Sequence, residues 1–151
     1  MIINQQVPPG EEIINLLIEH HHHMLSLSPP ESVHALDTQA LKSADVTFWG
    51  AWIDGELAGC GGLLQLDPQH GEIKSMRTAQ RFLRQGVAVR ILESVITEAT
   101  TRGYQRLSLE TGSDKAFRPA RELYLRHGFA ECAPFGSYSE DPHSVFMTLK
   151  L

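Results

Sequence analysis

The longest regular pattern of apolar residues lies between residues 86 and 103. Apolar side chains recur there every three or four positions, at Ala88, Ile91, Leu92, Val95, Ile96 and Ala99. This spacing puts them on one side of an α-helix and predicts an amphipathic helix with a single buried stripe. Gly103 follows the pattern, in the position where glycine commonly ends a helix because it tolerates positive φ.

Alternating and β-branched residues predict strands on both sides of this helix. They cover residues 1–7, 46–53, 57–66 and 71–78 before it, and residues 107–110 and 145–149 after it. Asp54-Gly55 connects the second and third of these strands. A two-residue Asp-Gly connection is typical of a type I′ hairpin turn, because both of its positions need positive φ.

Helical spacing also occurs near both ends of the chain. Residues 11–24 form one such segment, and Glu11 and Glu12 suit the N-terminus of a helix. A proline pair breaks that pattern, and a short second helix is expected over residues 33–41. Another helix is expected over residues 117–124, ended by glycine. When the last strand is counted with a hairpin partner before it, the element order is βααβββαβαββ, which indicates an α/β (α+β) fold with a mixed sheet covered by helices.

Size and charge narrow the classes of function. The 151 residues fit one domain over residues 1–151. The formal charge of −5 argues against the broad basic face that nucleic-acid binding needs. No apolar run has the length of a membrane-spanning helix, and the N-terminus lacks a secretory signal pattern. Two cysteines cannot form a disulfide framework, which favours a reducing, cytoplasmic compartment. Together with the charge and the apolar pattern, this predicts a cytoplasmic protein without membrane or nucleic-acid partners.

The strongest site signal is the junction that leads from the strand at residues 71–78 into the long helix. A helix N-terminus exposes unpaired N–H groups and positive dipole potential, which together suit a phosphate or pyrophosphate. Gly86 lets an oxygen approach the backbone, and Ala88 is too small to block it. The alternative is an ordinary strand-to-helix turn. A P-loop and the three-glycine dinucleotide motif both fit worse, because neither glycine spacing is present.

The segments GEIKSMRTAQRFLRQGVAVRILESVITEATTRGYQRLSLETG and ARELYLRHGF closely resemble the GCN5-related N-acetyltransferase (GNAT) superfamily. SPPESVHALD and FGSYSEDPHSVFMTLKL resemble its bacterial small-molecule and amino-acid N-acetyltransferases. The resemblance implies a twisted, mostly antiparallel sheet and acetyl-CoA as co-substrate. It also implies that one strand splays from the next, and that the cofactor lies on Met76, Arg77, Thr78, Arg84, Gln85, Gly86, Val87 and Ala88. Leu83 departs from the family pattern, which has Gln or Arg there.

The same resemblance implies two catalytic residues. Tyr124 matches the family tyrosine that can protonate the departing thiolate, and its alternative role is packing in the core. Glu72 matches a frequent family base, with His22, His23 and His127 as weaker candidates. The histidine run at residues 20–23 is either a face of the acceptor pocket or a solvated helix face. We expect no metal, because no cysteine or carboxylate cluster has matching spacing.

The resemblance also implies acceptor residues on the first two helices and the last hairpin, which flank the substrate cleft of the family. The candidates are His22, Ser28, Glu31, Ser32, His34, Tyr138 and Ser139. Arg77 lies on the cleft strand and can bind a substrate carboxylate. The predicted activity is therefore acetyl transfer from acetyl-CoA to the primary amine of a small or amino-acid-like acceptor in a ternary complex. A coenzyme A-binding regulatory domain without turnover and a protein N-acetyltransferase are the alternatives. A homodimer is consistent with exposed sheet edges.

Overall fold

A computed structural model describes residues 1–34, 40 and 43–151. Its strands are β1 Ile2–Gln6, β2 Val46–Ile53, β3 Glu56–Asp67, β4 His70–Thr78, β5 Arg106–Gly112, β6 Ala130–Cys132 and β7 Ser144–Lys150. Its α-helices are α1 Glu11–Leu27, α2 Val87–Thr101 and α3 Arg118–Arg126. Short 3₁₀ turns lie at η1 Pro30–Ser32, η3 Gln80–Phe82 and η4 Lys115–Phe117.

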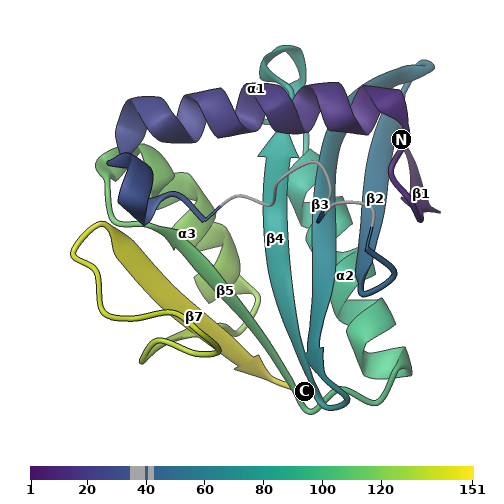
Figure 1. Ribbon diagram of the computed structural model, residues 1–151. Coiled ribbons are helices and arrows are strands. Elements are labelled where there is room, and N and C mark those ends of the chain that lie inside the picture. Colours follow the sequence, from purple (N-terminus) through teal and green to yellow (C-terminus); the bar gives the residue numbers. More distant parts are fainter. Residues whose placement is uncertain (35–39, 41–42) are drawn as a thin grey trace.

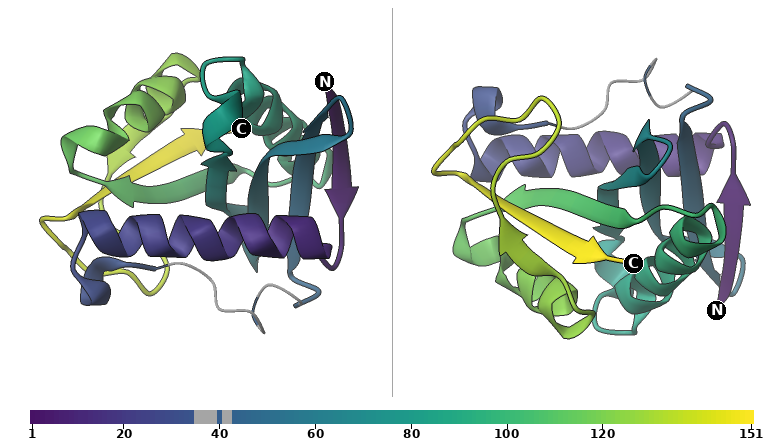
Figure 2. Two further views of the ribbon diagram at one scale, coloured as in Figure 1. Left: turned by 90° about the horizontal axis from the view of Figure 1, so that it is seen from above. Right: turned by 90° about the horizontal axis from the view of Figure 1, so that it is seen from below.

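The described strands form one sheet in the order β1-β2-β3-β4-β5-β7-β6. Every neighbouring pair is antiparallel except β4 and β5, which run parallel. Helix α1 crosses one face of the sheet, and α2 and α3 cover the other (Figures 1 and 2). The predicted fold class, a mixed and mostly antiparallel sheet flanked by helices, is confirmed.

Each face of the sheet has its own apolar layer, as strand alternation requires. Trp49, Leu63 and Ile73 pack with α2 and α3, whereas Phe48 and Cys60 pack with α1. The predicted hairpin is confirmed, because Asp54 and Gly55 have φ values of 49° and 79°. The second helix, expected over residues 33–41, falls mainly on residues 35–39 and 41–42, which lie outside the described residues.

Strands β4 and β5 pair over four residues only, from His70 opposite Arg106 to Ile73 opposite Leu109. Beyond that point β4 stays paired with β3 and separates from β5 (Figure 1). A register shift accompanies the separation. Cys60 and Gly62 of β3 have one residue between them, whereas their partners Arg77 and Lys74 on β4 have two. The extra residue on β4 is a β-bulge, which bends a strand and increases its twist. The splay implied by the family resemblance is therefore present.

Helix α2 lies close to the sheet because β3 has a glycine beneath its first turn. A Cβ atom on Gly59 would lie 2.7 Å from Cγ1 of Val87 and 2.8 Å from the carbonyl oxygen of Arg77. The absence of a side chain at residue 59 therefore sets how near the start of α2 comes to the splayed part of β4.

We expect Gly59→Ala to reduce the free energy of unfolding by about 1–3 kcal/mol, because the added methyl group overpacks the contact between α2 and β3. Gly55→Asn is the control, since a Cβ atom there meets nothing within 4 Å and asparagine tolerates positive φ. Urea unfolding measures both variants, and we expect the control to lose less than about 1 kcal/mol of unfolding free energy. Equal losses in the two variants would contradict the packing argument.

Candidate functional site

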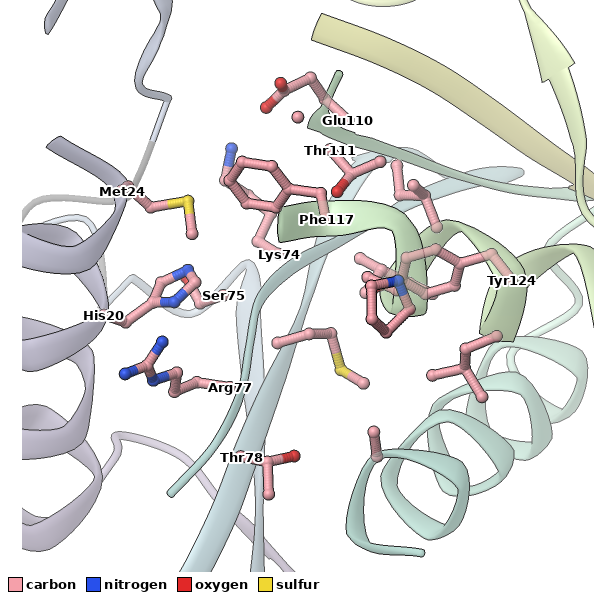
Figure 3. A pocket seen from close by; sticks show the side chains of 18 of the residues that line it. His20, Met24, Lys74, Ser75, Arg77, Thr78, Glu110, Thr111, Phe117 and Tyr124 are labelled. Carbon is pink, nitrogen blue, oxygen red and sulfur yellow. The ribbon is translucent and has the colours of Figure 1, made fainter. Parts of the chain in front are cut away.

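A cleft of about 790 Å³ opens where β4 and β5 separate. Helix α1 forms one wall, and the first turns of α2 and α3 form the opposite side (Figure 3). The cleft is continuous from the N-terminus of α2, past the exposed edge of β4, to the histidines of α1. A molecule with an anionic end and a long thin arm can therefore enter from one side while a second molecule enters from the other.

The α2 end of the cleft is the uncapped N-terminus of a helix. Gly86 is the N-cap residue with φ of 78°, it supplies no capping side chain, and a Cβ atom on it would meet nothing within 4 Å. The first amides of α2 therefore lack a side-chain acceptor and face open space. Among the predicted cofactor residues, Arg84, Gly86, Val87 and Ala88 line the cleft, whereas Gln85 does not.

The exposed edge of β4 forms the middle of the cleft. Met76, Arg77 and Thr78 all line it, as the predicted cofactor strand requires. Met76 and Arg77 lie on opposite faces, as neighbours in a strand do, and the bulge sets which of them faces α2. Met76 packs toward Gly61 and α2, whereas the Arg77 side chain reaches α1. The backbone of this segment has no partner on β5, so its polar groups can pair with an extended ligand.

Tyr124 of α3 faces the cleft from the α2 side, and Figure 3 shows its ring directed toward the interior. Its ring packs edge-on against Phe129, with 5.6 Å between the centroids. Burial raises the pKa of Tyr124 well above its usual value, so the phenol keeps its proton at neutral pH. Among the described residues its hydroxyl has no hydrogen-bond partner, and it is free to donate to a ligand.

Glu72 is buried and already hydrogen-bonded. Tyr138 donates its hydroxyl proton to Oε2 of Glu72 at 2.5 Å, and Lys74 Nζ donates to the same oxygen at 3.3 Å. Lys74 also donates to Tyr138 Oη at 3.1 Å. The predicted base and the predicted acceptor-side tyrosine thus lie together with a lysine that the sequence did not indicate.

Glu110 is a second carboxylate in the cleft, and the sequence analysis did not select it. It belongs to β5 and lies immediately after Leu109, the last residue of β5 that pairs with β4. Burial raises the pKa of Glu110 from 4.5 to about 7, although Ser144 and Lys74 act in the opposite direction. Alternation in this strand puts Leu109 in the α2 layer and Glu110 on the other face, which is the signal that could have identified it.

On the α1 side, Arg77 lies beside His20 (Figure 3). Its Nη1 is 2.9 Å from Nδ1 of His23, and its Nη2 is 3.4 Å from the exposed carboxylate of Glu19. Burial and the nearby Arg77 lower the pKa of His20 from 6.5 to about 4, so His20 is neutral. Within the described part of the chain, Arg77 Nε and His20 Nδ1 are buried and have no hydrogen-bond partner. Both can bind an oxygen-rich ligand group.

The remaining acceptor-side predictions divide into two groups. Ser28, Ser32 and His34 line the cleft, whereas His22, Glu31 and Ser139 do not. The Ser32 hydroxyl donates to Oδ2 of Asp141 at 2.6 Å, which joins η1 to the loop before β7.

Helix geometry explains why His20 rather than His22 faces the cleft. His20 continues the buried stripe of Ile13 and Leu17, whereas His22 is exposed.

In the described ranges, no group of three or more His, Cys, Asp or Glu side chains is arranged to hold a metal ion. None of the helices found there combines the length and apolarity required to cross a membrane.

Comparison with known proteins identifies the family. The model of the acetyltransferase (GNAT) family matches residues 11–129. The chain belongs to the GNAT acetyltransferase family. It is 56% identical over 142 residues to the N-acetyltransferase YsnE of Bacillus subtilis, with 94% of each chain covered. It is 52% identical over 136 residues to the N-acetyltransferase YedL of Escherichia coli, covering 90% of this chain and 86% of YedL.

Solved GNAT structures share the fold. A GNAT acetyltransferase from Elizabethkingia anophelis, crystallised with acetyl-CoA bound, superimposes with a TM-score of 0.72 at 20% identity, covering 99% of this chain and 97% of that one. The recognition made from the sequence is therefore confirmed, and the protein is an acyltransferase of the GNAT family.

We expect His20→Gln to make stability less sensitive to acid. The unfolded chain accepts a proton on His20 below about pH 6.5, whereas the folded protein resists it down to a pKa of about 4. Stability of the wild type therefore falls as the pH drops through this window, by about 3 kcal/mol from this residue. Urea unfolding at about pH 7 and about pH 4.5 measures the difference. His21→Gln, on the exposed side of α1, should keep the acid sensitivity of the wild type.

Proposed function

We propose that the protein transfers the acetyl group of acetyl-CoA to the primary amine of a small acceptor that also carries a carboxylate. Acetyl-CoA is the co-substrate of the family. The observation that supports this proposal best is the single cleft that joins the α2 N-terminus, the unpaired edge of β4 and the α1 histidines. Donor and acceptor can meet there at the point where β4 and β5 separate, in a ternary complex.

The donor lies, in this proposal, along β4. Its pyrophosphate binds the amides around Arg84 to Ala88, and its pantetheine arm pairs with the backbone of Met76 to Thr78. The open space above Gly86 and the missing β5 partner support this arrangement. Gln85 contributes through its backbone alone, since its side chain turns back toward the carbonyl oxygen of Arg81.

Acetyl transfer needs a free amine, a stabilised oxyanion and a protonated leaving group. The amine attacks the thioester carbon, and a backbone N–H near Met76 or Arg77 donates to the oxyanion. The C–S bond then breaks, and the Tyr124 phenol donates a proton to the thiolate. The raised pKa of Tyr124 ensures that the phenol holds this proton at neutral pH.

The acceptor binds between α1 and β4. The Arg77 guanidinium, with its unpaired Nε, is suited to a carboxylate, and the neighbouring neutral His20 can donate a further hydrogen bond. Ser28, Ser32, His34 and Tyr138 complete the lining on this side. A homodimer and a cytoplasmic location stay predictions from the sequence.

The deciding experiment measures thiol release from acetyl-CoA over a panel of amino acids, amines without a carboxylate, and lysine-containing peptides. We expect saturable release with amino acids and identification of the N-acetylated product by mass. Binding of acetyl-CoA without release would instead support a regulatory domain, and release with peptides alone would support a protein acetyltransferase.

We expect Tyr124→Phe to lower kcat on the order of 100-fold with little change in either KM, because the leaving thiolate loses its proton donor. Tyr104→Phe is the matched control. Tyr104 is equally buried but its hydroxyl donates to Gln65 Oε1 outside the cleft. Steady-state kinetics of both variants test this role, and equal effects would contradict it.

We expect Arg77→Met to lower kcat/KM for carboxylate-bearing acceptors about 10- to 100-fold, since a charge-assisted pair is lost. The KM for acetyl-CoA should change little, because the Arg77 side chain points toward α1. An acceptor amine without a carboxylate is the internal control. If its kcat/KM fell equally, Arg77 would not bind the carboxylate.

A further inference from the structure

The two carboxylates beside the separation of β4 and β5 have different surroundings. Glu72 lies one residue before Ile73, the last β4 residue that pairs with β5, and it accepts hydrogen bonds from Tyr138 and Lys74. Both bonds are made to Oε2 of Glu72, so this carboxylate already holds two neighbouring side chains in place. Glu72 therefore already has a positioning role beside the separation of the strands.

Glu110 occupies the point where the strands part. Leu109 is the last β5 residue that pairs with β4, and Glu110 is the next one along β5. Its side chain lines the cleft on the face opposite the core residue Leu109, and Figure 3 shows it with Thr111 at the upper end of the pocket. A thioester that follows the free edge of β4 would pass beside this carboxylate.

The charges around this end of the cleft also favour Glu110 as the proton acceptor. The positive charge of Lys74 is already balanced by its ion pair with Glu72. Among the described residues Glu110 has no ion pair of its own, so an incoming ammonium group is attracted to its ionised form.

We infer that Glu110 accepts the proton from the ammonium group of the acceptor, and that Glu72 instead holds Tyr138 and Lys74 in position. This inference rests on the proposed acetyl transfer and adds to it a catalytic residue. It also gives the acceptor site two ends, with the carboxylate of the acceptor at Arg77 and its amine at Glu110.

The protonation state of Glu110 supports the assignment. Burial raises its pKa to about 7, close to the value at which a general base works best near neutral pH. Its polar and charged neighbours come from three parts of the chain and comprise Glu72, Lys74, Tyr138, Asp141 and Ser144. A bound ammonium group adds a positive charge to this set, so it favours the ionised carboxylate that can accept a proton.

The proton balance is complete. The ammonium group transfers one proton to the Glu110 carboxylate and becomes an amine. The amine nitrogen bonds to the thioester carbon, and the nitrogen then loses a second proton as the C–S bond breaks. The thiolate gains one proton from Tyr124. The second proton from the nitrogen then restores the phenol of Tyr124. The proton on Glu110 leaves to solvent, and an N-acetylated product and a free thiol result.

The test compares Glu110→Gln with Glu72→Gln across a pH series, using an amino acid that the wild-type protein acetylates. We expect Glu110→Gln to lower kcat on the order of 100-fold at neutral pH. The deficit should shrink as the pH rises toward the pKa of the acceptor amine, because free amine then forms without a base. The KM for acetyl-CoA should stay within about twofold of the wild-type value, since the donor side of the cleft is unaltered.

In the wild type, kcat should fall below about pH 7 as Glu110 becomes protonated. Glu72→Gln should keep this fall in kcat, but it should raise the acceptor KM because Tyr138 is no longer held in position. Glu131→Gln, on the exposed edge strand β6, is the matched surface control and should behave as wild type. The assignment is overturned if Glu110→Gln keeps that fall, or if Glu72→Gln is the variant that loses it.

A second measurement does not depend on turnover. NMR titration of isotope-labelled glutamate side chains should show one carboxyl group that titrates near neutral pH in the wild type and is missing in Glu110→Gln. Absence of that signal would overturn the assignment even if acetyl transfer is confirmed. Absence of acetyl transfer to every amine tested would overturn the proposed function instead, and with it the catalytic role of Glu110.

Discussion

The separation of β4 from β5 is the feature on which the site depends. The two parallel strands pair as far as Ile73 and Leu109 and then diverge, while β4 remains bonded to β3 on its other side. Backbone groups in a sheet are normally paired, so an unpaired edge inside the molecule is a binding surface for an extended ligand. The bulge at Ser75, with φ of 58°, accompanies this divergence in a residue other than glycine.

The bulge also decides which face each following residue of β4 occupies. Without an extra residue, alternation from Ile73 would put Met76 on the α1 face and Arg77 on the α2 face. Because of the bulge, Met76 packs toward α2 and Arg77 reaches the histidines of α1. In the proposed function, the donor edge and the acceptor residues thus come from consecutive positions of one strand. Helix α2 can approach this strand closely because Gly59 has no side chain, which brings the amides of its first turn to the same cleft.

Local patterns in the sequence were enough to predict most of the elements and the glycine at the N-terminus of α2. The stripe of α2, the Asp54-Gly55 turn and the glycine before α2 are all encoded within a few residues. The contacts between distant residues were not predictable in this way. Tyr138 and Glu72 are hydrogen-bonded although they are 66 positions apart, and no spacing rule links them. Glu110 was missed because its neighbours in sequence identify a strand but not the place where that strand loses its partner.

The buried polar atoms on the α1 side are costly for the folded protein. A buried donor or acceptor without a partner destabilises the fold by about 1–3 kcal/mol, and both Arg77 Nε and His20 Nδ1 are in this condition within the described residues. Apolar side chains in the same positions would extend the adjoining layer of Ile13, Leu17 and Cys60. The two Nη atoms of Arg77 contact His23 and Glu19, so Nε is the guanidinium nitrogen that the described residues leave without a partner. In the proposed function, an acceptor carboxylate would accept hydrogen bonds from Arg77 Nε and from the His20 tautomer that is protonated on Nδ1, and so it would offset this cost.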